Sequence, residues 1–139
     1  EGAGEHLWPD TLDIMGWKVD PTGLGVIFDR SIPPFAEQQV GPAVTTILDR
    51  LGIARDSVDR FACHPGGAKV IAALEATLRL ARGTLDQERE VLRQYGNMSA
   101  PTVLFVLERL LETGLPRRTV LAALGPGFTC SALSLVRTA

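Results

Sequence analysis

Three short loops of the chain contain the side chains best suited to chemistry. They read His-Pro-Gly-Gly at 64–67, Tyr-Gly-Asn-Met-Ser at 95–99 and Leu-Gly-Pro-Gly-Phe-Thr at 124–129. Loops between regular elements are where rigid scaffolds usually carry their functional groups. A neutral histidine and an asparagine that converge on one point would supply two hydrogen-bond donors to a developing enolate or alkoxide oxygen. His64 and Asn97 are therefore the candidate catalytic residues.

Each of these motifs also has a purely structural interpretation. His-Pro-Gly-Gly is common in tight turns, although Gly66 and Gly67 would also let a ligand approach the free amides at a helix start. Asn97 follows Gly96 and could simply end a helix in the left-handed conformation. The stretch 125–127 is first of all a tight turn. No single motif decides between structure and chemistry.

The two cysteines are expected in the core rather than in a site. Cys63 is adjacent to His64, which suggests a Cys/His dyad, but neighbouring strand residues point to opposite faces. We therefore expect Cys63 to be a small buried apolar residue, and Cys130 to be buried in the last strand. These two cysteines match neither a metal-ligand spacing nor a disulfide framework, so we expect no metal.

Five short strands are expected to position the loops. One of them runs directly into His64, and Pro126-Gly127-Phe128 separates the last two in the manner of an antiparallel hairpin. The predicted strands cover residues 13–19, 23–29, 58–64, 119–125 and 129–137.

Apolar residues at helical spacing predict three helices between these strands, and a capping box predicts one more. The first is expected to start late or to kink at Gly41-Pro42, because proline interrupts a helix interior. Thr84 and Gln87 form a capping box for the third helix, and Ser99 is the expected N-cap of the fourth. The predicted ranges are about 40–51, 68–81, 85–94 and 100–113.

Alternating strands and helices predict an α/β fold with a mixed sheet covered by helices and a closing β-hairpin. The 139 residues suffice for one domain, expected over 13–139, with a flexible arm at 1–12. The net charge of −2 argues against a nucleic-acid surface, and no apolar run approaches the ~18 residues of a membrane span. The chain starts without a recognisable signal peptide, so we expect a cytoplasmic protein.

In their order and spacing, the three loops together resemble the C-terminal half of the type III polyketide synthases, the chalcone synthase family. The resemblance extends from Gly16 to Val136. Ketoacyl-acyl-carrier-protein synthase III and the plant ketoacyl-CoA synthases are similar in this half, but Pro65, Met98 and Pro126 favour the polyketide branch.

The resemblance implies a thiolase-like half-domain in which His64 and Asn97 act on coenzyme A thioesters. The pair would stabilise the enolate left by decarboxylation of malonyl-CoA and the oxyanion formed when it condenses with an acyl-CoA starter. The loop after the histidine would border the pantetheine arm, and the last loop would shape the cavity for the growing chain. The residues so implied are Gly66, Gly67 and Lys69 for coenzyme A, and Gly125, Pro126, Gly127, Phe128 and Val26 for the cavity.

The resemblance also implies a missing partner, because the family's nucleophilic Cys belongs to an N-terminal half and matches neither Cys63 nor Cys130. We expect half an enzyme that uses acyl-CoA and malonyl-CoA and holds no permanently bound cofactor. The face that meets the missing half would be apolar, and the isolated half is expected to form a homodimer. Two alternatives stay open: a ketoacyl synthase of the fatty-acid type, and a non-catalytic thiolase-like interaction module.

Overall fold

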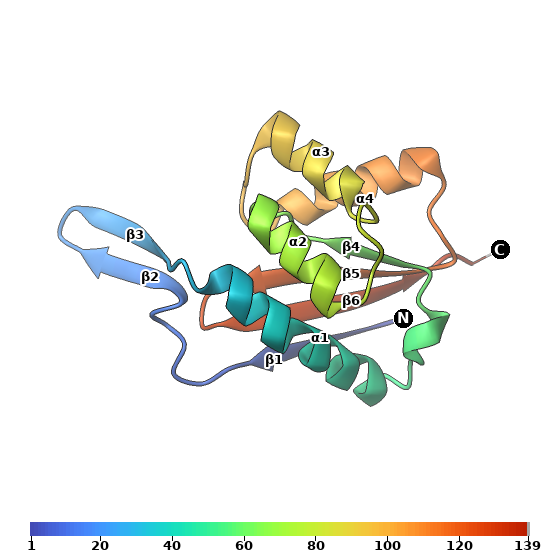
Figure 1. Ribbon diagram of the computed structural model, residues 1–139, viewed down its shortest axis with the longest axis horizontal. Helices are drawn as coiled ribbons and strands as arrows, with labels where there is room; N and C mark the ends of the chain where they lie inside the picture. The colour runs from blue at the N-terminus through green and yellow to red at the C-terminus, as the bar shows by residue number, and fades with distance from the viewer. Residues whose placement is uncertain (139) are drawn as a thin grey trace.

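The computed structural model describes residues 1–138 and contains a four-stranded sheet and a separate two-stranded hairpin (Figure 1). The larger sheet has the order β1-β6-β5-β4, in which β4 and β5 are parallel and the other pairs antiparallel. The predicted mixed sheet and the closing β5–β6 hairpin are therefore confirmed. The strands are β1 Gly2–Leu7, β2 Met15–Asp20, β3 Gly23–Phe28, β4 Arg60–Cys63, β5 Arg118–Gly125 and β6 Thr129–Val136.

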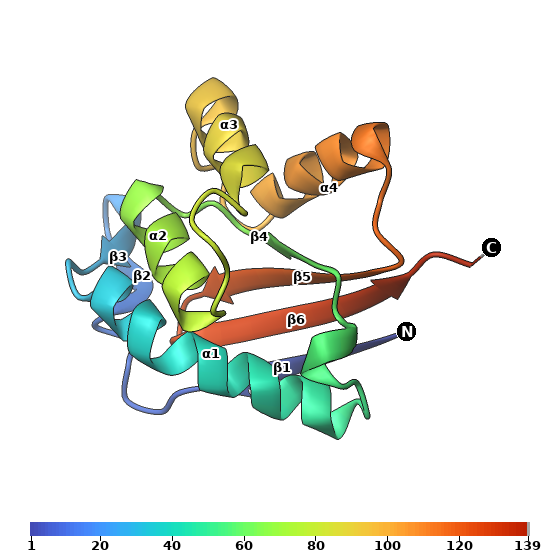
Figure 2. The same cartoon turned by 45° about the vertical axis from the view of Figure 1, so that its right-hand side comes forward.

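Helices cover both faces of the sheet, and successive side chains of β4 point to opposite faces. Phe61 and Cys63 belong to the core under α1 and α2, whereas Ala62 packs with residues of α3 and α4. Figure 2 shows α3 and α4 together at the β4 side of the sheet. Within residues 1–138, no helix combines the length and apolar character needed to cross a membrane. The helices are α1 Ile32–Arg50, the 3-10 turn η1 Arg55–Ser57, α2 Ala68–Thr77, α3 Asp86–Tyr95 and α4 Thr102–Thr113.

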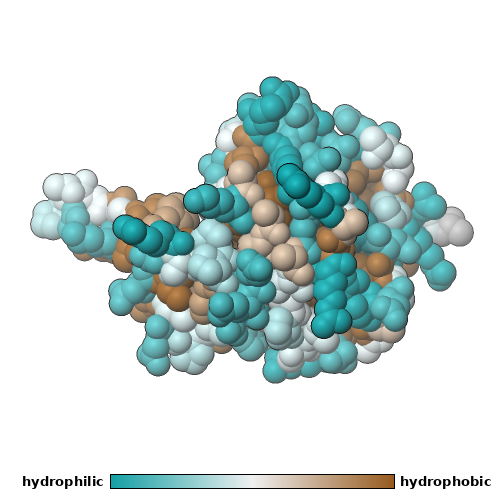
Figure 3. Space-filling model, viewed as in Figure 1, coloured by the Kyte–Doolittle hydropathy of each residue, from teal (hydrophilic) through white to brown (hydrophobic). Residues whose placement is uncertain are grey.

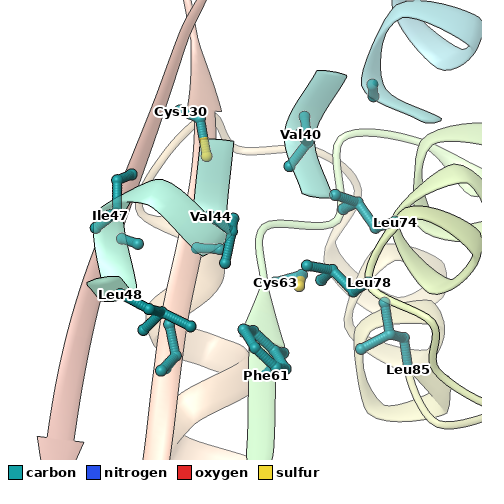
Figure 4. Close-up of a cluster of buried hydrophobic side chains, with 14 of the residues drawn as sticks. Val40, Val44, Ile47, Leu48, Phe61, Cys63, Leu74, Leu78, Leu85 and Cys130 are labelled. Atoms are coloured by element: carbon teal, nitrogen blue, oxygen red, sulfur yellow. The ribbon is translucent and has the colours of Figure 1, made fainter. Parts of the chain in front are cut away.

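The core beneath α1 uses the apolar stripe that predicted this helix. Val40, Val44, Ile47 and Leu48 are fully buried, and they belong to the same cluster as Phe61 of β4 (Figure 4). Residues spaced by three, four and seven positions share one face of an α-helix. The stripe therefore fixes which side of α1 lies on the sheet.

The first residues form a strand, so the prediction of a flexible arm over 1–12 is wrong for residues 2–7. β1 pairs antiparallel with β6 along its whole length. Its glycines suggested a loop, but packing requires them, because a Cβ on Gly4 would lie 2.6 Å from Cγ2 of Ile47. The Arg118 guanidinium also donates two hydrogen bonds of 2.9 Å to the Glu1 carboxylate.

The start of α1 also differs from the prediction. The helix begins at Ile32 rather than near residue 40, with Pro33 and Pro34 in its first turn. A proline is accepted there because the first amides of a helix have no intrahelical partner. Pro42 lies inside the helix at an exposed position. Proline thus neither delayed nor ended this helix.

The two predicted N-caps are wrong. Thr84 makes no cap bond to α3, and the buried Glu75 carboxylate of α2 instead accepts the Leu85 amide at 3.0 Å. Ser99 has a φ of 66° and accepts the Thr102 amide through its carbonyl, not its side chain. Long-range and backbone acceptors therefore replace the local side-chain caps.

Gly41 allows α1 and α2 to approach closely. Its amide donates to Oγ1 of Thr77 at 2.9 Å, and a Cβ on Gly41 would lie 2.4 Å from the Thr77 carbonyl oxygen. A backbone atom cannot move away as the end of a flexible side chain can. The contact therefore fixes the distance between the two helices that cover this face.

Replacing Gly41 with alanine is expected to lower the free energy of unfolding by about 1–3 kcal/mol, as for other overpacked sites. The cost comes from separating α1 from α2. Chemical denaturation measures it, and Gly25→Ala is the control, because its Cβ would meet no atom closer than 3.7 Å. Equal stability of the two variants would contradict this account of the α1–α2 contact.

Candidate active site

His64 follows β4 at the carboxyl end of the parallel β4–β5 pair. Its backbone amide donates to the Ala122 carbonyl at 2.7 Å, which continues the pairing by one residue. The side chain is only 5% exposed, and burial lowers its pKa below the ordinary histidine value. Burial therefore favours the neutral form of the imidazole. Nδ1 has no hydrogen-bond partner among residues 1–138.

Asn97 lies just beyond the end of α3. Gly96, with a φ of 72°, is the residue that takes the left-handed conformation at the helix end. Asn97 is thus not the helix stop that one interpretation of the sequence suggested. Its Nδ2 donates to the Gly66 carbonyl at 3.1 Å, and its Oδ1 accepts the Ser99 amide at 2.9 Å. The carboxamide therefore joins the 64–67 loop to the 95–99 loop.

Both candidate residues line one cavity of about 770 Å³. Its walls come from the β2–β3 hairpin, the start of α1, the two loops just described and the end of β5. The cavity thus lies outside the carboxyl ends of strands, the usual place for a ligand in an α/β sheet. Figure 3 shows apolar residues gathered at the base of the protruding hairpin.

Most residues predicted to bind substrate reach this cavity. Gly66, Gly67 and Lys69 line it on one side, and Val26 and Pro126 line it on others. Lys69 is exposed and carries a positive charge at this wall.

The prediction that Phe128 lines the cavity is wrong. Its side chain is fully buried, with ring centroids 4.9 Å from Phe35 and 5.8 Å from Trp8. These aromatic neighbours come from α1 and from the segment after β1, which no pattern in the sequence predicted to lie together. Gly125 and Gly127 flank Pro126 in the turn but are not among the cavity-lining residues.

The β2–β3 wall of the cavity was predicted from the sequence only at Val26. Trp17 of β2 is directly opposite Val26 of β3, and Phe28 is opposite Met15; all four line the cavity. Val26 and Phe28 are two positions apart, so they share a face of β3. The apolar residues at alternate positions, Met15 and Trp17 in one strand and Val26 and Phe28 in the next, were the available signal.

Neither cysteine can serve as the nucleophile of this site. Cys63 and Cys130 are free and fully buried. Burial raises the pKa of Cys63 well above the ordinary value and that of Cys130 to about 12. Both thiols therefore stay protonated and packed in the core, as the alternation of side chains predicted for Cys63. In the part of the chain that the structure describes, no three potential metal-binding side chains cluster.

The chain matches the family model for the chalcone and stilbene synthases, C-terminal domain, over residues 2–138. The chain belongs to this family. The cavity at the His64 and Asn97 loops is therefore found in a C-terminal chalcone and stilbene synthase domain, which establishes the resemblance noted in the sequence.

Relatives of this chalcone and stilbene synthase domain include enzymes from bacteria and plants. A 1,3,6,8-tetrahydroxynaphthalene synthase of Streptomyces peucetius subsp. caesius is 37% identical over 135 residues, which are 95% of this chain and 36% of that protein. Type III polyketide synthase 21 of Oryza sativa subsp. japonica is 34% identical over 130 residues, or 90% of this chain and 33% of that protein. The chain thus spans roughly a third of their length.

Solved structures of the family agree with this fold. The 1,3,6,8-tetrahydroxynaphthalene synthase of Streptomyces coelicolor A3(2) aligns with a TM-score of 0.87 at 29% identity, covering 100% of this chain and 41% of that one. CsyB complexed with CoA-SH aligns with a TM-score of 0.85 at 25% identity, covering 98% and 39%. The chalcone and stilbene synthase domain is therefore a mixed α/β unit of a larger thiolase-like architecture.

Burial of His64 predicts a pH dependence of stability. As pH falls through the ordinary histidine range, the unfolded chain gains a proton that the folded chain resists, so the free energy of unfolding decreases. Between about pH 8 and about pH 5, wild type should lose more stability than His64→Gln. Denaturation at the two pH values measures the difference. Equal losses, or a smaller loss in wild type, would contradict the neutral buried imidazole.

Proposed function

We propose that the chain is the C-terminal half of an acyltransferase that condenses an acyl-CoA starter with malonyl-CoA by decarboxylative Claisen condensation. The observation that carries the proposal is that His64 and Asn97 line one cavity and are joined through Gly66. The names of the relatives as polyketide and tetrahydroxynaphthalene synthases, and a related structure in complex with CoA-SH, support the same chemistry.

The two donors act where negative charge develops. When the bond from malonyl carbon to carboxylate breaks, CO₂ leaves and its electron pair forms an enolate on the thioester oxygen. A proton on Nε2 of His64 would donate to that oxygen and leave only a lone pair at the buried, unpartnered Nδ1. Asn97 donates one N–H to Gly66 and keeps a second for the same oxygen.

Carbon–carbon bond formation requires a group that this chain does not supply. The enolate carbon attacks an acyl thioester held on a Cys of the N-terminal half, and the Cys thiolate leaves when the tetrahedral oxyanion collapses. The same donors stabilise that oxyanion. We expect the chain alone to be inactive in acyl transfer, because Cys63 and Cys130 are buried and protonated.

Coenzyme A would approach along the loop after His64. Gly66 and Gly67 lack side chains, so the pantetheine arm could lie against their backbone. Lys69 adds a positive charge at the same wall, where it could meet a phosphate of the coenzyme. Coenzyme A thioesters enter as substrates in this proposal, and no permanently bound cofactor is required.

The alternatives to this function explain fewer of the observations. A purely structural interaction module would not need a buried neutral imidazole and a carboxamide on one cavity. A ketoacyl synthase of the fatty-acid type could use the same pair, but family membership favours polyketide synthesis.

The pair can be tested in the complete synthase by its decarboxylation of malonyl-CoA. His64→Ala and Asn97→Ala are each expected to lower kcat roughly 100- to 1,000-fold, the usual effect of losing one oxyanion donor. His6→Ala and Gln94→Ala are the controls, because neither residue lines the cavity. Unchanged decarboxylation in both cavity variants would remove them from the catalytic machinery and end the proposed function.

The proposal includes an N-terminal half, a homodimer and a cytoplasmic location. Apolar side chains exposed on α4 and β6 support a partner, since Leu104, Leu111 and Leu133 are each at least 41% exposed. Beside Leu104 and Leu133 lies a shallow hollow of about 530 Å³ on the sheet. Acyl-CoA and malonyl-CoA are cytoplasmic metabolites, which supports the location.

The isolated chain is expected to self-associate through this open face, because uncovered apolar patches drive association. Light scattering should give a mass of at least a dimer, whereas Leu104→Glu should shift the chain towards monomer. Leu24→Glu, which adds the same charge at an exposed site on the hairpin, is the control. A clean monomer at high concentration would contradict the expected association.

A further inference from the structure

Side chains, instead of a neighbouring strand, make hydrogen bonds to the backbone groups on the outer edge of β4. β4 is the last strand of the sheet, so only β5 pairs with its backbone. On its other side, the Cys63 amide donates to Oε1 of Glu88 at 3.0 Å, and the Arg60 guanidinium donates to the Phe61 carbonyl. The same guanidinium binds Oε2 of Glu88 at 2.6 Å.

This ion pair is buried, and burial makes it costly. The side chain of Glu88 is 0% exposed and that of Arg60 is 9% exposed. Desolvation raises the pKa of Glu88, although the charge of Arg60 and the Cys63 amide both oppose the shift. A buried ion pair often adds no more stability than an apolar pair of similar volume. Stability alone therefore gives little reason for a charged pair here.

The position of Glu88 relates it to both candidate catalytic residues. Cys63, whose amide it accepts, directly precedes His64. Glu88 lies in the first turns of α3, and Asn97 follows the other end of the same helix. α3 and the residues that follow it thus contact the 63–66 segment twice: through Glu88 at the Cys63 amide and through Asn97 at the Gly66 carbonyl.

We propose that Glu88 is a positioning residue that holds the His64 loop against α3, with Arg60 as its counter-ion. An α-helix is a rigid spacer of about 1.5 Å per residue, so fixing one end to Cys63 fixes where the other end presents Asn97. The relative placement of imidazole and carboxamide then depends on this buried carboxylate. The inference rests on the proposed function, since it assigns Glu88 a role only through those two residues.

The test compares two double variants of the complete synthase that differ in one hydrogen-bond acceptor. Glu88→Gln with Arg60→Met retains an oxygen for the Cys63 amide, and Glu88→Met with Arg60→Met replaces it with a thioether of similar shape. For decarboxylation of malonyl-CoA, the Met/Met variant is expected to lose roughly 10- to 100-fold in kcat with little change in KM. The Gln/Met variant should recover most of that loss. Both should unfold at similar denaturant concentrations.

Glu90→Gln, at a half-buried position of α3 where the carboxylate pairs with Arg93, is the control and should retain wild-type kcat. If the Met/Met variant does not fold, Glu88→Gln and Glu88→Met are compared with Arg60 retained. Equal kcat in the Gln and Met variants, whether high or low, would overturn the positioning role. If His64→Ala and Asn97→Ala lower decarboxylation as expected, that result leaves the proposed function standing, whereas unchanged decarboxylation in both ends the proposed function and the positioning role together.

Discussion

The site depends on one hydrogen bond between two loops, from the Asn97 carboxamide to the Gly66 carbonyl. Gly66 lies beyond β4 and Asn97 beyond α3, so this contact sets how the two loops face each other. It is possible because β4 delivers His64 at the end of a parallel pair and α3 ends at Gly96. Gly96 takes the positive φ at the helix end, and the side-chain amide of Asn97, the next residue, points towards the 64–67 loop. A cavity with two convergent polar side chains is the result.

The two faces of the sheet that supports these loops are covered to different extents. On one face of the sheet, α1 and α2 pack against β4 through a large apolar cluster, which holds the strand before His64 in place. On the opposite face, the smaller cluster of α3 and α4 leaves apolar residues of α4 and β6 exposed. A domain whose apolar residues are covered on one face and exposed on the other is suited to packing against a second domain. The family relationship, in which this chain spans roughly a third of each relative, agrees with that architecture.

Local patterns in the sequence predicted the elements, but contacts between distant residues decided the details. The strand into His64, the α4 helix and the closing hairpin follow from periodicity and turn residues, and the structure confirms them. β1 was missed because its glycines serve the approach of α1, which only the fold reveals. The cap of α3 was missed for the same reason, since its acceptor is a carboxylate on another helix. In the site, the His64 and Asn97 loops were found from motif chemistry, while Phe128 was misplaced because its aromatic partners are remote in sequence.

The hairpin that walls the cavity makes its ladder of hydrogen bonds within itself, β2 to β3, and takes no part in the main sheet. One backbone bond from Gly127 to Met15 ties its base to the last turn. Side chains such as Trp17 and Val26 can thus be exchanged for larger or smaller ones with little disturbance to the hydrophobic core. Substitutions in the hairpin could in this way change the volume of the cavity while the His64 and Asn97 loops stay unchanged. Diversity of product and constancy of chemistry would then reside in separate parts of one small domain.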